Sequence, residues 1–219
     1  MAEPTFSSRY QRHPGLILGF HGTDLQVVKD VVERRLDHLA RSERVYDWLG
    51  HGVYFWEDDP ERALRWARGG HSSRAIAKPA VLGAVIDLGL CLDLSTELGR
   101  VEVINAYQTL AAATKVAETQ PPKNSLGPDA VLRELDCEVI EVLHQTRKDR
   151  GEPPYDTVRG LFHEGGQLYP GSGFHQLTHV QIAVLNTDCI KGYFQPIPER
   201  SAHRSSGHST TARKARKAR

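Results

Sequence analysis

The sequence has no long hydrophobic run. None of its apolar stretches approaches the roughly 18 residues that a membrane-spanning helix needs. The opening residues 1–5 also lack the basic and apolar regions of a secretory signal peptide. We therefore expect a cytoplasmic protein that has no membrane partner.

Cysteine is scarce, and its positions argue against a metal site. The three cysteines, Cys91, Cys137 and Cys189, lie far apart, without the close spacing of zinc ligands. His175 and His179 are four residues apart, but the glycine before them and the apolar segment after them argue against a helix that would align their rings. We expect no bound metal and three buried, reduced thiols, as in a reducing cytoplasm.

Positive charge is concentrated at the C-terminal end. The chain has 28 basic and 27 acidic residues. Residues 199–219 contain seven of the basic residues and one of the acidic residues, so the rest of the chain holds 21 basic and 26 acidic residues. Residues 201–219 have almost no large apolar side chains and cannot bury enough surface to offset the entropy of ordering. We expect a disordered basic tail, which is either a solubilising end or a salt-dependent contact to nucleic-acid phosphates.

The remaining chain is long enough for one sizeable domain. Apolar periodicity predicts strands over 16–20, 52–56, 81–94 with a turn, 156–163 and 180–185, and helices over 25–39, 61–68, 101–118 and 129–145. Strands at both ends with helices between them predict the α+β class. The expected layout is an N-terminal extension over 1–15, a domain over 16–197 with a helical insertion at about 96–150, and the tail over 198–219.

Two glycine-flanked segments carry the functional signal. The first is His21-Gly22-Thr23, and the second covers residues 50–55, Gly-His-Gly-Val-Tyr-Phe. Because glycine has no Cβ, it lets a backbone approach a ligand closely. An imidazole and an aromatic ring beside such glycines indicate a cleft for a flat, hydrogen-bonding ring such as nicotinamide.

These segments resemble two motifs of the ADP-ribosyltransferases of the poly(ADP-ribose) polymerase-like branch. His21-Gly22-Thr23 is similar to the opening motif, and residues 50–55 are similar to the glycine-x-glycine-x-tyrosine-phenylalanine strand. The strand expected over 180–185 lies where that family places a third motif residue, usually glutamate, and here Gln181 takes that place. The resemblance implies a split, two-sheet α+β fold that holds NAD in an extended cleft.

The resemblance also implies roles for individual residues in holding NAD. His21 would bond a ribose hydroxyl, and the backbone of Gly22, followed by Thr23, would pair with the nicotinamide amide. Tyr54 would stack on the nicotinamide ring, with Trp66 as a second wall. Offset stacking of aromatic rings contributes roughly 0.5–1.5 kcal/mol beyond the burial of area.

The expected chemistry is cleavage of the bond between nicotinamide and ribose, which builds positive charge on the sugar. A carboxylate would stabilise that charge, whereas Gln181 offers only an amide oxygen and takes up no proton near neutral pH. Glu164 is the nearest carboxylate in sequence that would substitute. With His21, Tyr54 and Gln181 as the catalytic set, we expect NAD-dependent mono-ADP-ribosyl transfer to a protein or nucleic-acid acceptor, with nicotinamide released.

Two alternatives remain open. An RNA 2′-phosphotransferase-like enzyme would share the fold and use NAD, but it needs basic residues along the cleft, and the sequence offers no convincing set outside the tail. A catalytically silent module that binds NAD, ADP-ribose or nucleic acid is favoured by the glutamine at position 181.

Overall fold

A computed structural model describes residues 12–69, 76–125 and 132–198 of the chain. Most of the expected N-terminal extension and the basic tail from residue 199 onward lie outside the described residues. Among the described residues, no helix is both long enough and apolar enough to cross a membrane.

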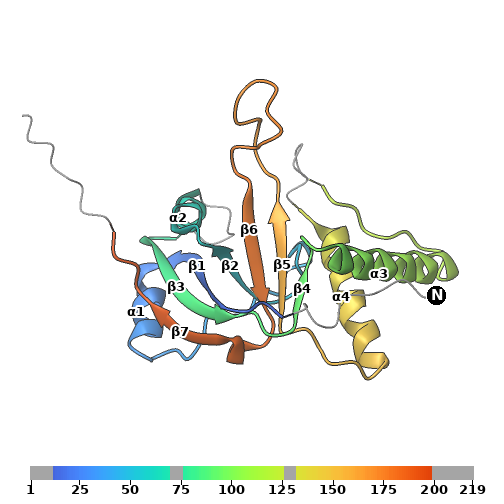
Figure 1. Ribbon diagram of the computed structural model, residues 1–219, viewed down its shortest axis with the longest axis horizontal. Helices are drawn as coiled ribbons and strands as arrows, with labels where there is room; N and C mark the ends of the chain where they lie inside the picture. The colour runs from blue at the N-terminus through green and yellow to red at the C-terminus, as the bar shows by residue number, and fades with distance from the viewer. Residues whose placement is uncertain (1–11, 70–75, 126–131, 199–219) are drawn as a thin grey trace, which may run out of the picture.

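The protein belongs to the α+β class, as the sequence predicts. Figure 1 shows the helices packed around a strongly bent sheet. The strands are β1 (Leu16–Asp24), β2 (Val53–Glu57), β3 (Pro79–Asp87), β4 (Cys91–Asp93), β5 (Thr157–Phe162), β6 (His179–Val184) and β7 (Ile190–Phe194). The helices are α1 (Leu25–Val32), α2 (Pro60–Gly69), α3 (Glu97–Val116) and α4 (Glu134–Asp149).

The described strands form one sheet and not the two separate sheets that the resemblance implies. Their order is β4-β5-β6-β2-β1-β3-β7, and every pair is antiparallel except β4 with β5. The two halves are joined where β1 meets β2, through the pairs Gly19–Glu57 and Phe20–Trp56. Because this ladder is so short, β5 and β6 stand apart from the curved ribbon of β1, β3 and β7 in Figure 1.

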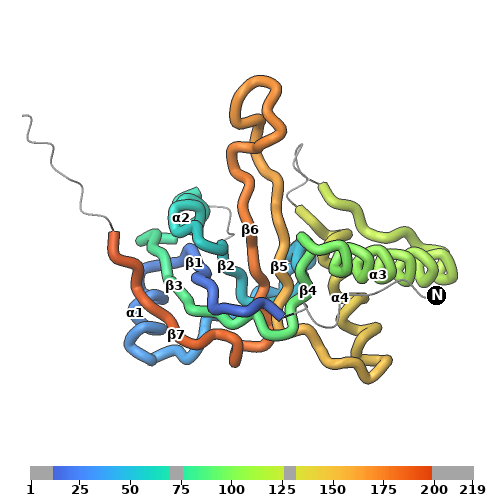
Figure 2. Tube along the Cα trace, viewed as in Figure 1, coloured from blue at the N-terminus to red at the C-terminus, as the bar shows by residue number. Residues whose placement is uncertain are grey.

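Each face of the sheet has its own apolar layer. Helix α1 covers the face that carries Phe55, Leu82 and Ile182. On the opposite face, α2 packs over Phe20 and Trp56, and α3 and α4 pack over the region of β5 and β6. The opposite face therefore has helices at both ends, with the first residues of β6 between them (Figure 2).

Local sequence signals account for several of these boundaries. Asp24 caps α1, its carboxylate accepting from the Gln26 backbone N–H at 2.9 Å, and Pro60 occupies the first position of α2. The apolar stretch 81–94 divides into β3 and β4 around Gly89, whose φ of +58° favours glycine.

Two boundary predictions are wrong. The first helix ends at Val32 rather than Leu39, because Arg34 adopts a left-handed conformation with φ of +58°, although Leu39 still packs in the core from a loop. The strand over 180–185 is not the last one, since β7 follows it and pairs with β3. The apolar pattern does not predict β7, because Lys191 and Gly192 interrupt it.

Gly22 lets α2 pack closely against β1, because it has no side chain in the way. A Cβ atom built there would lie 2.1 Å from the backbone oxygen of Ala63, whereas one built at Gly192 would meet no atom within 4 Å. We predict that Gly22→Ala lowers the free energy of unfolding by about 2–3 kcal/mol and that Gly192→Ala changes it by less than about 0.5 kcal/mol. Urea unfolding measures both values, and equal stability of the two variants would contradict this packing.

Candidate functional site

The candidate site begins where β1 and β2 separate. Their pairing stops at Phe20–Trp56, while β1 continues beside β3 through the pairs of His21, Gly22 and Thr23. Within the described residues, the edge of β1 that faces β2 therefore has no strand partner from His21 onward. This open edge contains the His-Gly-Thr motif, whose backbone groups on that side have no strand partner among the described residues.

His21 fills the opening between the two strands. Its Nδ1 atom lies 2.7 Å from the backbone oxygen of Tyr54, and its ring meets Phe55 edge-on at 6.0 Å. Because a carbonyl oxygen only accepts, Nδ1 carries the proton and Nε2 is left as an acceptor. Burial lowers the pKa of His21, partly opposed by the Tyr54 carbonyl, so the ring is neutral at pH 7.

Tyr54 projects its side chain to the opposite face of the sheet. Phe20 pairs with Trp56, and side chains alternate along a strand, so the rings of His21 and Tyr54 lie on different faces. The structure thus brings His21 to the Tyr54 backbone, and not to its ring. The Tyr54 hydroxyl donates to the Gly50 oxygen at 2.8 Å and accepts from the Leu49 N–H at 2.9 Å, while burial raises its pKa well above the ordinary value.

Gln181 lies on the same face as Tyr54, opposite Trp56 in the β2–β6 ladder. Its Oε1 accepts a hydrogen bond from Trp48 Nε1 at 2.6 Å. Since an indole N–H only donates, this contact fixes which end of the amide is oxygen. The oxygen expected to accept from a ribose hydroxyl therefore already holds one hydrogen bond.

A row of rings extends across this face, and the sequence analysis missed most of it. Trp66 of α2 lies 5.8 Å from Trp56, measured between ring centroids, and Trp56 lies 6.3 Å from His179. The row continues from His179 to Phe162 at 5.2 Å and from Phe162 to Trp48 at 4.9 Å. Alternation along the strands could have predicted this row, because residues two apart on a strand share a face. Trp56 is two residues from Tyr54, Phe162 from Gly160, and His179 from Gln181.

An ion pair stands beside this row. Arg62 of α2 and Glu164, which follows β5, are 2.6 Å apart, and their side chains are only 11% and 20% exposed. The Arg62 guanidinium also lies 5.7 Å from the Trp56 ring centroid. Glu164 is therefore near the site, as its proposed substitute role requires, but its charge is balanced by Arg62.

Two buried donors at this place lack acceptors. Among the described residues, Trp56 Nε1 and Arg62 Nε are enclosed and have no hydrogen-bond partner. Leaving a buried donor unpaired costs about 1–3 kcal/mol. Because both atoms are enclosed, a ligand reaches them only if the side chains around them move.

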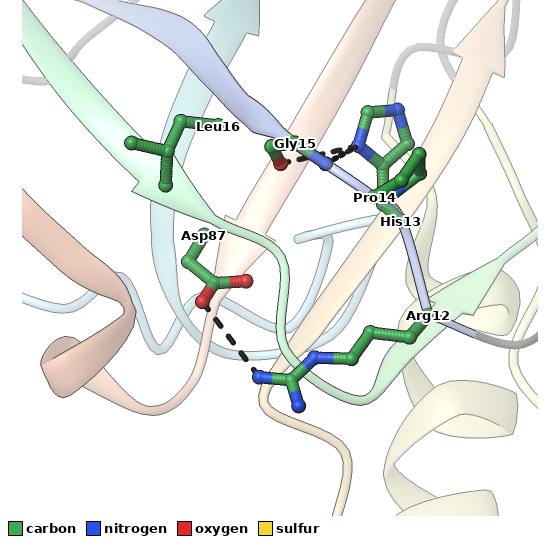
Figure 3. Close-up of a pocket in the computed structure, with 6 residues that line it drawn as sticks. All are labelled: Arg12, His13, Pro14, Gly15, Leu16 and Asp87. Carbon is green, nitrogen blue, oxygen red and sulfur yellow. Dashed lines mark hydrogen bonds and ion pairs between the residues drawn. The ribbon is translucent and has the colours of Figure 1, made fainter.

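Other hollows lie away from the candidate site. Figure 3 shows one of about 400 Å³ lined by Arg12, His13 and Asp87, near the start of β1 and thus at the other end of that strand from His21. A second, of about 380 Å³, lies between α3 and α4 behind Trp48. Neither contains His21, Tyr54 or Gln181.

The cysteines contribute no reactive thiolate. All three are free, Cys137 and Cys189 are buried as predicted, and Cys91 is only half-buried. Burial raises the pKa of Cys91 and Cys137 to about 12 and that of Cys189 to about 11. Within the described ranges, no three His, Cys, Asp or Glu side chains gather in a way that would hold a metal ion.

No protein-family model matches the chain, and neither a curated protein nor a solved structure is found to be similar to it. The resemblance to ADP-ribosyltransferases therefore rests on the sequence motifs alone. Inferences about function must come from the geometry of the site.

The Tyr54 hydroxyl provides a test of this geometry. We predict that Tyr54→Phe lowers the free energy of unfolding by about 1–3 kcal/mol, because the buried Leu49 N–H loses its acceptor. Tyr169→Phe is the matched control, because Tyr169 is 56% exposed and its hydroxyl is free to contact water. If urea unfolding gives the same stability for both variants, the buried hydroxyl contacts are not formed in solution.

Proposed function

We propose that this protein is an NAD-dependent mono-ADP-ribosyltransferase. The observation that carries the proposal is the opening between β1 and β2. There a neutral imidazole, bonded to the backbone of Tyr54, stands beside an unpaired strand edge. A row of aromatic side chains lies on the opposite face of the sheet from this imidazole.

In this proposal each part of NAD has a partner. His21 Nε2 accepts a hydrogen bond from a ribose hydroxyl, and the free edge at Gly22 and Thr23 pairs with the carboxamide. The nicotinamide ring lies against Tyr54 and Trp66, whose side chains are on the opposite face of the sheet from His21, so the ligand passes through the opening between β1 and β2.

The reaction breaks the bond between ribose C1′ and the nicotinamide nitrogen, and nicotinamide leaves as a neutral molecule. The acceptor forms a new bond to C1′ and loses a proton. Gln181 stabilises the positive charge on the sugar through its amide dipole, more weakly than a carboxylate does. This weaker stabilisation favours a single transfer over chain elongation. The acceptor is a protein or a nucleic acid, and the basic residues after 199 supply positive charge for the latter.

Nicotinamide release from NAD tests the proposal. We predict that His21→Ala and Tyr54→Ala each lower kcat/KM for release by tenfold or more, a loss of at least about 1.4 kcal/mol of transition-state stabilisation. Val116→Ala, at an 86% exposed position at the end of α3, is the control and should leave release unchanged. Unchanged turnover in both site variants would refute the assignment.

One observation favours a second candidate, a catalytically silent NAD-binding module. The amide of Gln181 has no charge, and its oxygen is already engaged by Trp48. Calorimetry distinguishes the two candidates, because the silent module binds NAD and releases no nicotinamide over hours. The RNA 2′-phosphotransferase alternative needs basic side chains that bind the RNA phosphate. Arg62 does not support it, since its guanidinium is paired with Glu164.

A carboxylate at position 181 should accelerate the reaction. Gln181→Glu keeps an acceptor for the Trp48 indole and adds a negative charge near the developing cation. We predict that nicotinamide release rises by about tenfold or more. Gln108→Glu, at an exposed position of α3, is the matched control for charge and should have no effect. A rate for Gln181→Glu at or below that of the native protein would contradict the role given to position 181.

A further inference from the structure

A histidine outside the recognised motifs shares the face of Gln181. His179 is the first residue of β6, two positions before Gln181, and it pairs with Phe162 of β5. Residues two apart on a strand project from the same face, about 6.5–7 Å from each other. In Figure 2, the start of β6 lies where the loop of residues 163–178 leaves the sheet and projects away from the body.

The imidazole of His179 has a fixed tautomer. Its Nδ1 lies 2.6 Å from the backbone oxygen of Leu177, so Nδ1 carries the proton and Nε2 holds a free lone pair. The residue is only 6% exposed. Within the described residues, Nε2 has no hydrogen-bond partner. Its lone pair is therefore not engaged by another described residue.

The surroundings keep His179 neutral and ready to receive a proton. Trp56 and Phe162 flank the ring, and burial among them lowers its pKa. The charged groups that face it are Arg62 of α2, Glu164 of the loop and Asp59 of the turn before α2. The two carboxylates stabilise the imidazolium once it forms, and Arg62 opposes it.

We infer that His179 is the general base that takes the proton from the acceptor during ADP-ribosyl transfer. The inference rests on the proposed function. As the bond from C1′ to nicotinamide breaks, the acceptor atom bonds to C1′ and its proton passes to Nε2 of His179, which later releases it to water. Gln181, which takes up no proton, is left with stabilising the sugar.

This assignment narrows the class of acceptor. A nucleophile that still carries a proton, a hydroxyl above all, needs a base to become reactive. A carboxylate acceptor is already ionised at pH 7 and gains nothing from one. The site therefore suits acceptors that attack through a protonated atom.

Nucleophile exchange tests the inference, with NAD as the substrate and water or azide as the probe. Water must lose a proton when it attacks C1′, whereas the azide anion has none to lose. We predict that His179→Gln lowers nicotinamide release with water by about a hundredfold and that azide restores at least a tenth of the native rate. His13→Gln, at an exposed position near the start of β1, is the control and should behave as the native protein does.

The pH profile of the native protein provides a readout that does not depend on how a variant folds. Protonation of His21 affects both nucleophiles, so the informative quantity is the ratio of kcat/KM with water to that with azide. This ratio should fall on the acidic side of about pH 6.5, because protonation of His179 removes the base that only water needs. A native acidic limb that is the same for both nucleophiles would overturn the inference, as would a His179→Gln variant with full water-dependent release. If the native protein releases no nicotinamide, the proposed function itself fails and His179 has no such role.

Discussion

The hydrogen bond between His21 Nδ1 and the backbone oxygen of Tyr54 is the contact on which the rest of the site depends. It spans the place where β1 and β2 stop pairing, so a side chain bridges a gap that the sheet leaves open. The same bond fixes the tautomer of His21 and directs Nε2 toward any ligand at the free edge. It also sets the backbone position of Tyr54, from which the aromatic face extends.

The face beyond that opening has little net charge. Arg62 and Glu164 balance each other, and Gln181 replaces the glutamate that the resemblance leads one to expect. Such a site binds mainly through aromatic surface and hydrogen bonds, because Glu164 is paired with Arg62 and the Asp59 carboxylate accepts from the Arg62 backbone N–H. In the reaction that we propose, it also separates two tasks that one glutamate would perform, with an amide to stabilise the sugar and a buried histidine to take the proton.

Sequence reasoning identified the parts of the site that have local signatures. The glycine spacing of residues 50–55 and the apolar periodicity of the strands that carry His21 and Gln181 each depend on neighbours within a few residues. The contacts it missed join distant residues, such as Trp48 with Gln181 and Arg62 with Glu164, which are 133 and 102 positions apart. The single sheet was missed for the same reason, because a two-pair ladder between β1 and β2 leaves no periodic pattern.

A crystal structure of the protein with a non-cleavable carbocyclic analogue of NAD would show where the dinucleotide binds. A ribose hydroxyl should lie within hydrogen-bond distance of His21 Nε2, and the nicotinamide ring should lie against Tyr54. The hydrogen bond from His21 Nδ1 to the Tyr54 oxygen should persist. A dinucleotide bound elsewhere, for example in the hollow between α3 and α4, with the β1–β2 opening unoccupied, would contradict the proposed site.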